Sequence, residues 1–217
     1  MGDIFREVDE ELKQERYEKL WRQYRWYIIA AAASLVISVG GWQVWKEYTT
    51  SQRYIEGRWF ASASELLLEG KTGQATEAFS RLAEDATSGY GILARFNQAS
   101  IAARAGDALQ AIKIYDNITV DGGVPNSMRG LATVLAALQA LKAPSISGQT
   151  IREKIQPMSS AGRPYRHVAL EILALTAQRE GNVEMARSHY RAIVDDPDAA
   201  TGIRTRAAQM LNILGAS

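Results

Sequence analysis

The chain has 217 residues, no cysteine and a formal net charge of +1. A charge this close to neutral excludes the concentrated basic face of a nucleic-acid-binding protein, and the lack of cysteine excludes disulfide bonds. Alanine is abundant, there are only five prolines, and runs of alternating β-branched residues are absent. This composition predicts an all-α fold, because alanine favours helices and β-branched residues favour strands.

Residues 1–25 carry apolar side chains at intervals of three and four, from Ile4 to Tyr24, which is the spacing of one face of a helix. Oppositely charged residues four positions apart, such as Glu15 and Lys19, support a helix in this head segment. We therefore predict an N-terminal amphipathic helix. Two interpretations stay open: a solvated helix that leads into a membrane, or a docking helix for a cytoplasmic partner.

Residues 26–45, which read WYIIAAAASLVISVGGWQVW, contain no charged side chain. A helix of this length spans roughly 30 Å, the thickness of the hydrocarbon core of a bilayer. Aromatic side chains, which favour the membrane interfaces, stand at both ends, with Trp21 and Tyr24 before the segment and Tyr48 after it. The segment therefore predicts a single transmembrane helix.

The basic residues beside this segment predict its orientation, because such residues are retained on the cytoplasmic side. The head side has Lys13, Arg16, Lys19, Arg22 and Arg25, and the other side has Lys46, Arg53 and Arg58. We therefore predict a cytoplasmic head and place residues 46–217 across the membrane. A cleaved signal peptide is the alternative. It would have an unusually long charged region, and Trp42 and Trp45 would stand where cleavage requires small residues.

The body, residues 46–217, contains a weak internal repeat in which glycine is followed by alanine five positions later and by a large side chain four positions after that. The copies are Gly73, Ala78 and Leu82; Gly106, Ala111 and Tyr115; and Gly181, Ala186 and Tyr190. The wider gap between the second and third copies leaves room for one irregular unit. We predict that unit as helices over residues 127–141 and 150–158, joined by a loop through Pro144 and Gly148.

Each copy of the repeat predicts a helical hairpin. The glycine lies between two helical patterns, where the turn needs a left-handed residue, and Asp107 and Asn182 follow it as caps for the second helix. The first helices supply the small residues Ala99 and Ala174 for close packing. Because one hairpin cannot bury its apolar face alone, neighbouring hairpins are expected to stack into an α-solenoid.

This pattern resembles the tetratricopeptide repeat (TPR), in which the first helix has a small residue, the second has alanine and an aromatic residue, and proline ends the unit. The matching residues are Ala99 and Ala174 in first helices, Ala111, Tyr115, Ala186 and Tyr190 in second helices, and Pro125 and Pro197 at the ends. The first unit departs from the pattern, with Leu66 at the small position and Leu82 at the aromatic one. The resemblance implies a TPR-like domain over residues 46–217.

The whole layout, an acidic and basic head, one apolar span and a degenerate repeat body, resembles the YfgM-like family. These are inner-membrane proteins of Gram-negative bacteria, described as TPR-like ancillary subunits of the Sec translocon. The resemblance implies a single-pass anchor, a cytoplasmic N-terminus, a periplasmic repeat domain, and cooperation with periplasmic chaperones. It implies no catalytic residues.

Little in the sequence points to chemistry. Two histidines, His167 and His189, and no cysteine are a poor basis for a zinc site, and no nucleophile elbow or phosphate-binding loop is present. We therefore predict no enzymatic activity, no cofactor, no metal and no small-molecule substrate. Solenoids bind partners along a groove lined mainly by first helices. The candidate contact residues on these helices are Phe96, Ser100, Arg104, Glu171, Gln178 and Arg179.

Two functional hypotheses follow. In the first, the protein is a non-enzymatic, membrane-anchored scaffold whose body binds proteins at the Sec translocon: translocon subunits, periplasmic chaperones or segments of client proteins. In the second, the protein is a membrane tether or regulator whose head helix binds a cytoplasmic signalling protein. Deletion of residues 1–20 distinguishes them, because only the second hypothesis requires the head.

Overall fold

The computed structural model describes the backbone of residues 3–215, and it describes side chains from Trp21 onward except those of Ile28, Ala31 and Ala32. The chain divides into two compact units, Met1–Tyr54 and Ile55–Ser217, called unit 1 and unit 2 below. Every regular element within residues 3–215 is helical, which confirms the predicted all-α fold.

Unit 1 is helical from Asp3 onward, within helix α1 (Asp3–Leu68). The predicted head helix therefore exists as backbone, while the side chains before Trp21 that define its amphipathic face lie outside the described residues. Described apolar side chains of the segment 26–45 are largely exposed. Among the described residues, no helix is both long enough and apolar enough to cross a bilayer, and the span predicted over residues 26–45 stays a prediction.

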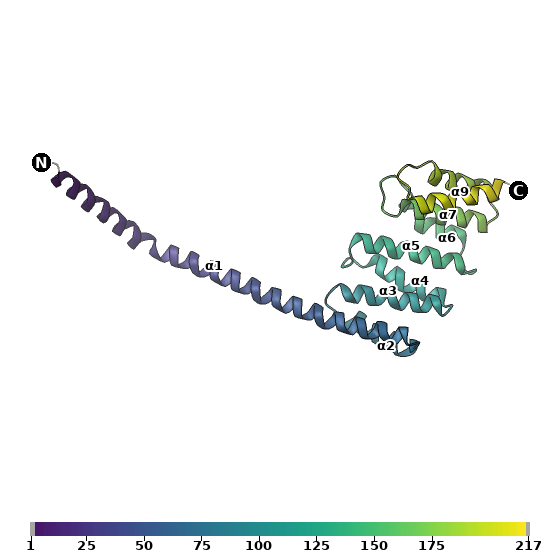
Figure 1. Ribbon diagram of the computed structural model, residues 1–217, viewed down its shortest axis with the longest axis horizontal. Helices are drawn as coiled ribbons and strands as arrows, with labels where there is room; N and C mark the ends of the chain where they lie inside the picture. Colours follow the sequence, from purple (N-terminus) through teal and green to yellow (C-terminus); the bar gives the residue numbers. More distant parts are fainter. Residues whose placement is uncertain (1–2, 216–217) are drawn as a thin grey trace. The chain divides into compact units, whose positions relative to one another are not determined.

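Unit 2 is built of helical pairs that follow one another along the chain (Figure 1). Residues 55–68 of α1 pair with α2 (Thr72–Asp85), and α3 (Gly89–Arg104) pairs with α4 (Ala108–Val120). The remaining elements are α5 (Asn126–Lys142), α6 (Gly148–Ile155), the 3₁₀ turn η1 (Gln156–Met158), α7 (Arg166–Arg179), α8 (Val183–Val194) and α9 (Thr201–Gly215).

The core of unit 2 is a row of apolar clusters, each shared by consecutive helices. Fully buried alanines hold the helix axes close together, and large side chains fill the remaining space. In the second pair, Ala99 of α3 packs with Ala111 and Tyr115 of α4. The arrangement supports the predicted TPR-like solenoid, because each pair depends on its neighbours to bury its apolar face.

Three hairpins of unit 2 turn in the same way. Gly70, Gly106 and Gly181 have φ angles of 78°, 85° and 75°, the left-handed region in which glycine is least strained. At Gly106, the glycine N–H donates to the carbonyl of Ala103 at 3.3 Å, and the next N–H, of Asp107, donates to Ala102 at 3.0 Å. The same pair of bonds occurs at Gly70 and Gly181. This is the Schellman motif, which ends a helix while satisfying its last carbonyls.

These turns correct the prediction for the first unit. Its turn residue is Gly70, whereas Gly73 lies inside α2. The repeat is therefore Ala63, Gly70, Ala75 and Phe79 instead of Gly73, Ala78 and Leu82, and Ala63 replaces Leu66 at the small position. Ala63, Ala75 and Phe79 are all fully buried. In this register the first unit has the same spacing as the second and third, including the aromatic residue that it was predicted to lack.

The caps and the irregular unit agree with the prediction. The Asp107 carboxylate accepts a hydrogen bond from the N–H of Gln110 at 2.9 Å, and the Asn182 side chain accepts one from Met185 at 3.0 Å. The helices predicted over residues 127–141 and 150–158 correspond to α5 and to α6 followed by η1. In α6, Ile151 and Ile155 are buried where the other units have alanine and an aromatic residue. Helix α9, which was not predicted, covers the last pair.

Candidate functional site

A cavity of about 590 Å³ lies beside the start of α5 in unit 2 and is called the α5–η1 cavity below. It lies among the end of α4, the start of α5, η1 and the loop that leads into α7. Its cationic lining residues are Arg129, Lys154 and Arg163, and its apolar ones include Pro157, Pro164 and Tyr165. Among the described residues, no acidic side chain lines it.

Tyr165 forms one wall of this cavity in an unusual conformation. Its φ is 64°, and it is the only residue other than glycine in the left-handed region within the part of the chain that the structure describes. Such a backbone costs about 1–3 kcal/mol, so it persists only where neighbours hold it. The Tyr165 hydroxyl donates to the carbonyl of Ser127 at 3.1 Å. At Gly130, an added Cβ would lie 3.1 Å from Cε2 of Tyr165, so the glycine leaves room for the ring.

The three cations of the α5–η1 cavity differ in how far they are neutralised. The Lys154 ammonium lies 2.6 Å and 2.7 Å from the two carboxylate oxygens of Asp116. Arg129 bonds the amide oxygen of Asn126, which carries no charge. It forms no ion pair among the described residues, but after the Gly123 N–H and Arg95 its charge also helps to lower the pKa of the Asp121 carboxyl. None of the side-chain hydrogen bonds or ion pairs found among the described residues involves Arg163, which is exposed. The cavity therefore keeps an excess of positive charge.

The predicted contact residues of α3 divide into core and surface. Phe96 packs in the core against Tyr115, with ring centroids 5.9 Å apart. Ser100 is half-buried, and Arg104 is exposed at the last turn of α3. No hydrogen bond or ion pair among the described residues involves the Arg104 guanidinium. Arg104 is therefore the residue of these three whose side chain is available to bind a partner.

The predicted contact residues of α7 each hold another helix of unit 2. The Glu171 carboxylate accepts two hydrogen bonds from Arg206 of α9, both at 3.0 Å. The Gln178 side chain accepts one from the hydroxyl of Tyr190 at 2.9 Å. Burial, together with the nearby charge of Glu171, raises the pKa of Tyr190 to about 12. These side chains join α7 to α8 and α9, so a partner would have to share them.

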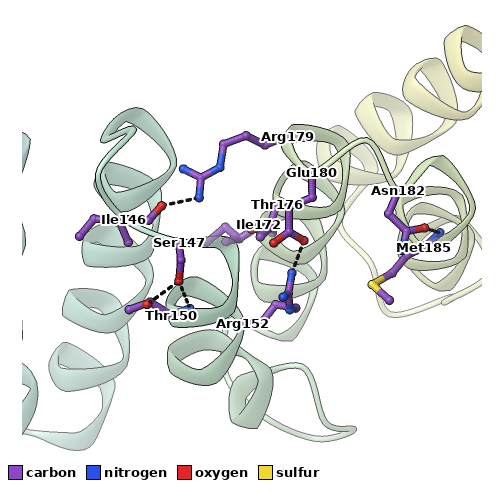
Figure 2. Close-up of polar contacts among 10 residues, drawn as sticks. All are labelled: Ile146, Ser147, Thr150, Arg152, Ile172, Thr176, Arg179, Glu180, Asn182 and Met185. Carbon is purple, nitrogen blue, oxygen red and sulfur yellow. Dashed lines mark hydrogen bonds and ion pairs between the residues drawn. The ribbon is translucent and has the colours of Figure 1, made fainter.

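Arg179 fastens the loop between α5 and α6. Figure 2 shows its guanidinium reaching back from the end of α7 to the carbonyl of Ile146, a distance of 2.7 Å. It also donates to the carbonyl of Ala140 at 3.2 Å, at the end of α5. The next residue, Glu180, pairs with Arg152 of α6. The end of α7 thus holds both sides of the irregular unit.

A second hollow, of about 310 Å³, lies near the start of unit 2. Trp59, Ala78 and Leu82 give it an apolar lining, and Arg81 stands at its edge. The Arg81 guanidinium is paired with Glu77 at 2.6 Å. None of the six predicted contact residues lines either hollow, so the cavities are surfaces that the sequence analysis missed.

The two histidines, His167 and His189, lie in helices α7 and α8. Burial, followed by the charge of Arg166, lowers the pKa of His167, and its Nε2 lies 3.0 Å from an Asp196 oxygen. Burial alone lowers the pKa of His189. Among the described residues, no three metal-ligating side chains come together.

The comparisons with known proteins agree with the geometry of the hairpins. Residues 18–145 match a protein-family model described as a tetratricopeptide repeat-like domain, and this range covers more than half of the 217 residues. A search of the curated proteins and a search of the solved structures each found no match.

Proposed function

We infer the function from the family: the chain belongs to the tetratricopeptide repeat-like domain family, and we propose that it is a non-enzymatic scaffold that binds other proteins through unit 2. The single observation that carries this proposal is the repeated hairpin. Ala63, Ala99 and Ala174 occupy the same position seven residues before a left-handed glycine, and all three are fully buried. Stacks of such units present long surfaces suited to distributed contacts with a protein.

We further propose that residues 26–45 anchor the protein in a membrane. The segment has no charged residue, and its described apolar side chains are exposed around the helix, including Trp26 at 67%, Ile37 at 73% and Trp42 at 71%. Burying apolar side chains stabilises a protein by about 25 cal/mol per Å² of surface removed from water, so we expect lipid or protein to cover this segment. A helix that is apolar all round is typical of a membrane span.

The finer assignment rests on the resemblance to the YfgM-like family. We propose a bacterial inner-membrane protein with a cytoplasmic N-terminus and unit 2 in the periplasm, because more basic residues precede the apolar segment than follow it. Its proposed partners are subunits of the Sec translocon, together with periplasmic chaperones or segments of client proteins. The absence of cysteine suits an oxidising compartment, where free thiols are hazards.

Partner purification from detergent-solubilised membranes tests this scaffold. We expect translocon subunits or periplasmic chaperones to co-purify with the full chain and with a variant that lacks residues 1–20. Arg104→Glu should reduce their recovery, because it reverses an exposed charge on a first helix. The change breaks no internal bond, since the Arg104 guanidinium has none among the described residues. Arg191→Glu, an exposed cation on α8, is the matched control. Loss of every partner on removal of the head would favour the alternative, a tether whose head helix binds a cytoplasmic signalling protein.

A further inference from the structure

We propose that the α5–η1 cavity is a docking site for an acidic segment of a partner protein, with one large apolar side chain of that segment seated among Pro157, Pro164 and Tyr165. This inference rests on the proposed scaffold function and names the chemistry of one partner segment. It concerns a surface that includes none of the six residues predicted from the sequence.

Charge complementarity identifies the occupant. Three cationic side chains line the cavity, no acidic side chain among the described residues does so, and only Lys154 is paired with a carboxylate. The first residues of α5, Asn126 and Ser127, also line it. The N-cap of α5, Pro125, provides no side-chain acceptor, so the positive end of that helix faces the same region without a carboxylate or hydroxyl cap. A ligand with several carboxylates would complement both features.

The apolar part of the lining limits the ligand further. The apolar residues that line the same cavity are Pro157, Met158, Pro164 and Tyr165. The volume of about 590 Å³ lies within the range of ordinary binding cavities. A phosphate ligand would contact the cations but would make no use of this apolar wall. A peptide with carboxylates on either side of one large apolar side chain uses both kinds of lining.

The cavity is also built at a structural cost. Tyr165 is held in the left-handed region although it is not glycine, and its position depends on the bond to Ser127 and on the missing side chain at Gly130. Strained backbones are found preferentially at binding and catalytic sites. The tyrosine ring is thereby fixed as a wall before any ligand arrives, which reduces the entropy lost on binding.

The balance of charge favours a protein ligand over a nucleic acid. The body carries nineteen basic and seventeen acidic residues, so it lacks the overall excess of basic residues that is typical of nucleic-acid-binding domains. A membrane surface also needs an extended basic or apolar face, whereas this site is a hollow.

The test uses the full chain in detergent micelles and a fluorescein-labelled peptide of nine residues, eight glutamates and a central phenylalanine. Fluorescence anisotropy should show saturable binding that weakens as salt rises, and the same peptide with lysines in place of glutamates should not bind. Arg163→Glu should weaken binding about tenfold. The control Arg191→Glu makes the same charge change on an exposed part of α8, so it should change binding less than about twofold.

A second variant tests the wall independently of charge. Gly130→Ala places a Cβ 3.1 Å from the Tyr165 ring, so the ring must shift and peptide binding should weaken while circular dichroism stays unchanged. Equal binding of both peptides, no binding of the glutamate peptide, or equal losses in Arg163→Glu and Arg191→Glu would overturn the proposal. Binding of anionic phosphatidylglycerol vesicles that depends on Arg163, without binding of the peptide, would also overturn it.

The failure of this inference is separate from a failure of the proposed function. If Arg163→Glu leaves peptide binding unchanged while partners still co-purify through unit 2, the scaffold stands and the cavity is not its docking site. If no partner co-purifies with unit 2 at all, the scaffold itself is wrong.

Discussion

The carboxylate of Glu56, in α1, accepts a hydrogen bond from the backbone N–H of Thr87 at 2.8 Å. It also accepts bonds from the Thr87 hydroxyl at 3.0 Å and from the N–H of Ser88 at 3.2 Å. Glu56 is only 3% exposed, so a buried acid in the first helix of unit 2 holds the turn that precedes α3. The bonds offset the cost of burying the charge, because each donor stabilises the ionised carboxylate.

Glu56 makes the stability of unit 2 depend on pH. Burial by itself would raise the pKa of Glu56, but the hydrogen bonds from Ser88 and Thr87 outweigh it and hold the pKa below its ordinary value of 4.5. The unfolded chain therefore takes up the proton first as pH falls. The stabilisation is complete above about pH 4.5, the ordinary value, and is lost as pH falls through the lower folded-state pKa.

We expect Glu56→Gln to lower the free energy of unfolding at pH 7 by about 1–3 kcal/mol and to flatten its fall toward pH 3. Urea denaturation followed by circular dichroism at several pH values measures both effects. The control Glu65→Gln changes an exposed glutamate of the same helix and should have little effect. An unchanged pH dependence in Glu56→Gln would contradict the role assigned to the hydrogen bonds.

The corrected register of the first hairpin predicts opposite signs for two glycine substitutions. Gly70→Ala forces alanine to adopt a φ of 78° and should destabilise unit 2 by about 1 kcal/mol. Gly73 lies in α2 with nothing within 4 Å of an added Cβ, so Gly73→Ala should stabilise the unit by about 0.5–1 kcal/mol. Thermal denaturation of the two variants side by side tests the register, and reversed signs would restore Gly73 as the turn residue.

The same register predicts which alanine of α2 is the contact residue. Ala75→Leu inserts a larger side chain into the fully buried cluster around Ala63 and Phe79, which should cost about 1–3 kcal/mol. Ala78→Leu is the matched change three residues on, at a half-buried position beside the smaller hollow, and should cost less than about 1 kcal/mol. Chemical denaturation compares them. A greater loss from Ala78→Leu would support the register first predicted from the sequence.

The loop between α5 and α6 should loosen when Arg179 is removed. Arg179→Met keeps the aliphatic stem but deletes the donors to Ala140 and Ile146, so amide exchange over residues 143–148 should accelerate while α3 and α4 stay protected. Hydrogen exchange read by mass spectrometry measures this. Arg104→Met removes a cation without such bonds and is the control. Equal exchange in the wild type and Arg179→Met would show that the guanidinium does not hold the loop.

The sequence predicted the hairpins at Gly106 and Gly181 because each glycine is followed by a capping residue, Asp107 or Asn182. The capping residue is a second, independent signal for the start of the next helix. The first hairpin lacks this second signal. Lys71 follows Gly70 and provides no side-chain cap, so Gly73 was an equally good turn in the sequence. Only the packing of the helices decides between two such glycines.

The α5–η1 cavity could not be predicted from the repeat. It depends on the packing of the Tyr165 ring against Gly130. These residues are far apart in the sequence, and neither carries a local turn or cap signal. Arg179 was selected as a residue of a first helix that lines the groove, and its bonds to the carbonyls of Ala140 in α5 and Ile146 in the next loop likewise follow from tertiary packing. A repeat pattern predicts where helices begin and end. It does not predict which side chains of one hairpin bond to the next hairpin, because those contacts depend on tertiary packing.

Site-specific photo-crosslinking in intact cells tests the central claim most directly. Two probes replace the exposed residues Arg104 and Leu109 of unit 2. A third probe replaces Leu12 of the head. A protein-binding scaffold predicts crosslinks from the unit 2 probes to translocon subunits, periplasmic chaperones or client segments. Crosslinks from Leu12 alone, and only to cytoplasmic proteins, would contradict this account and favour a tether that acts through its head.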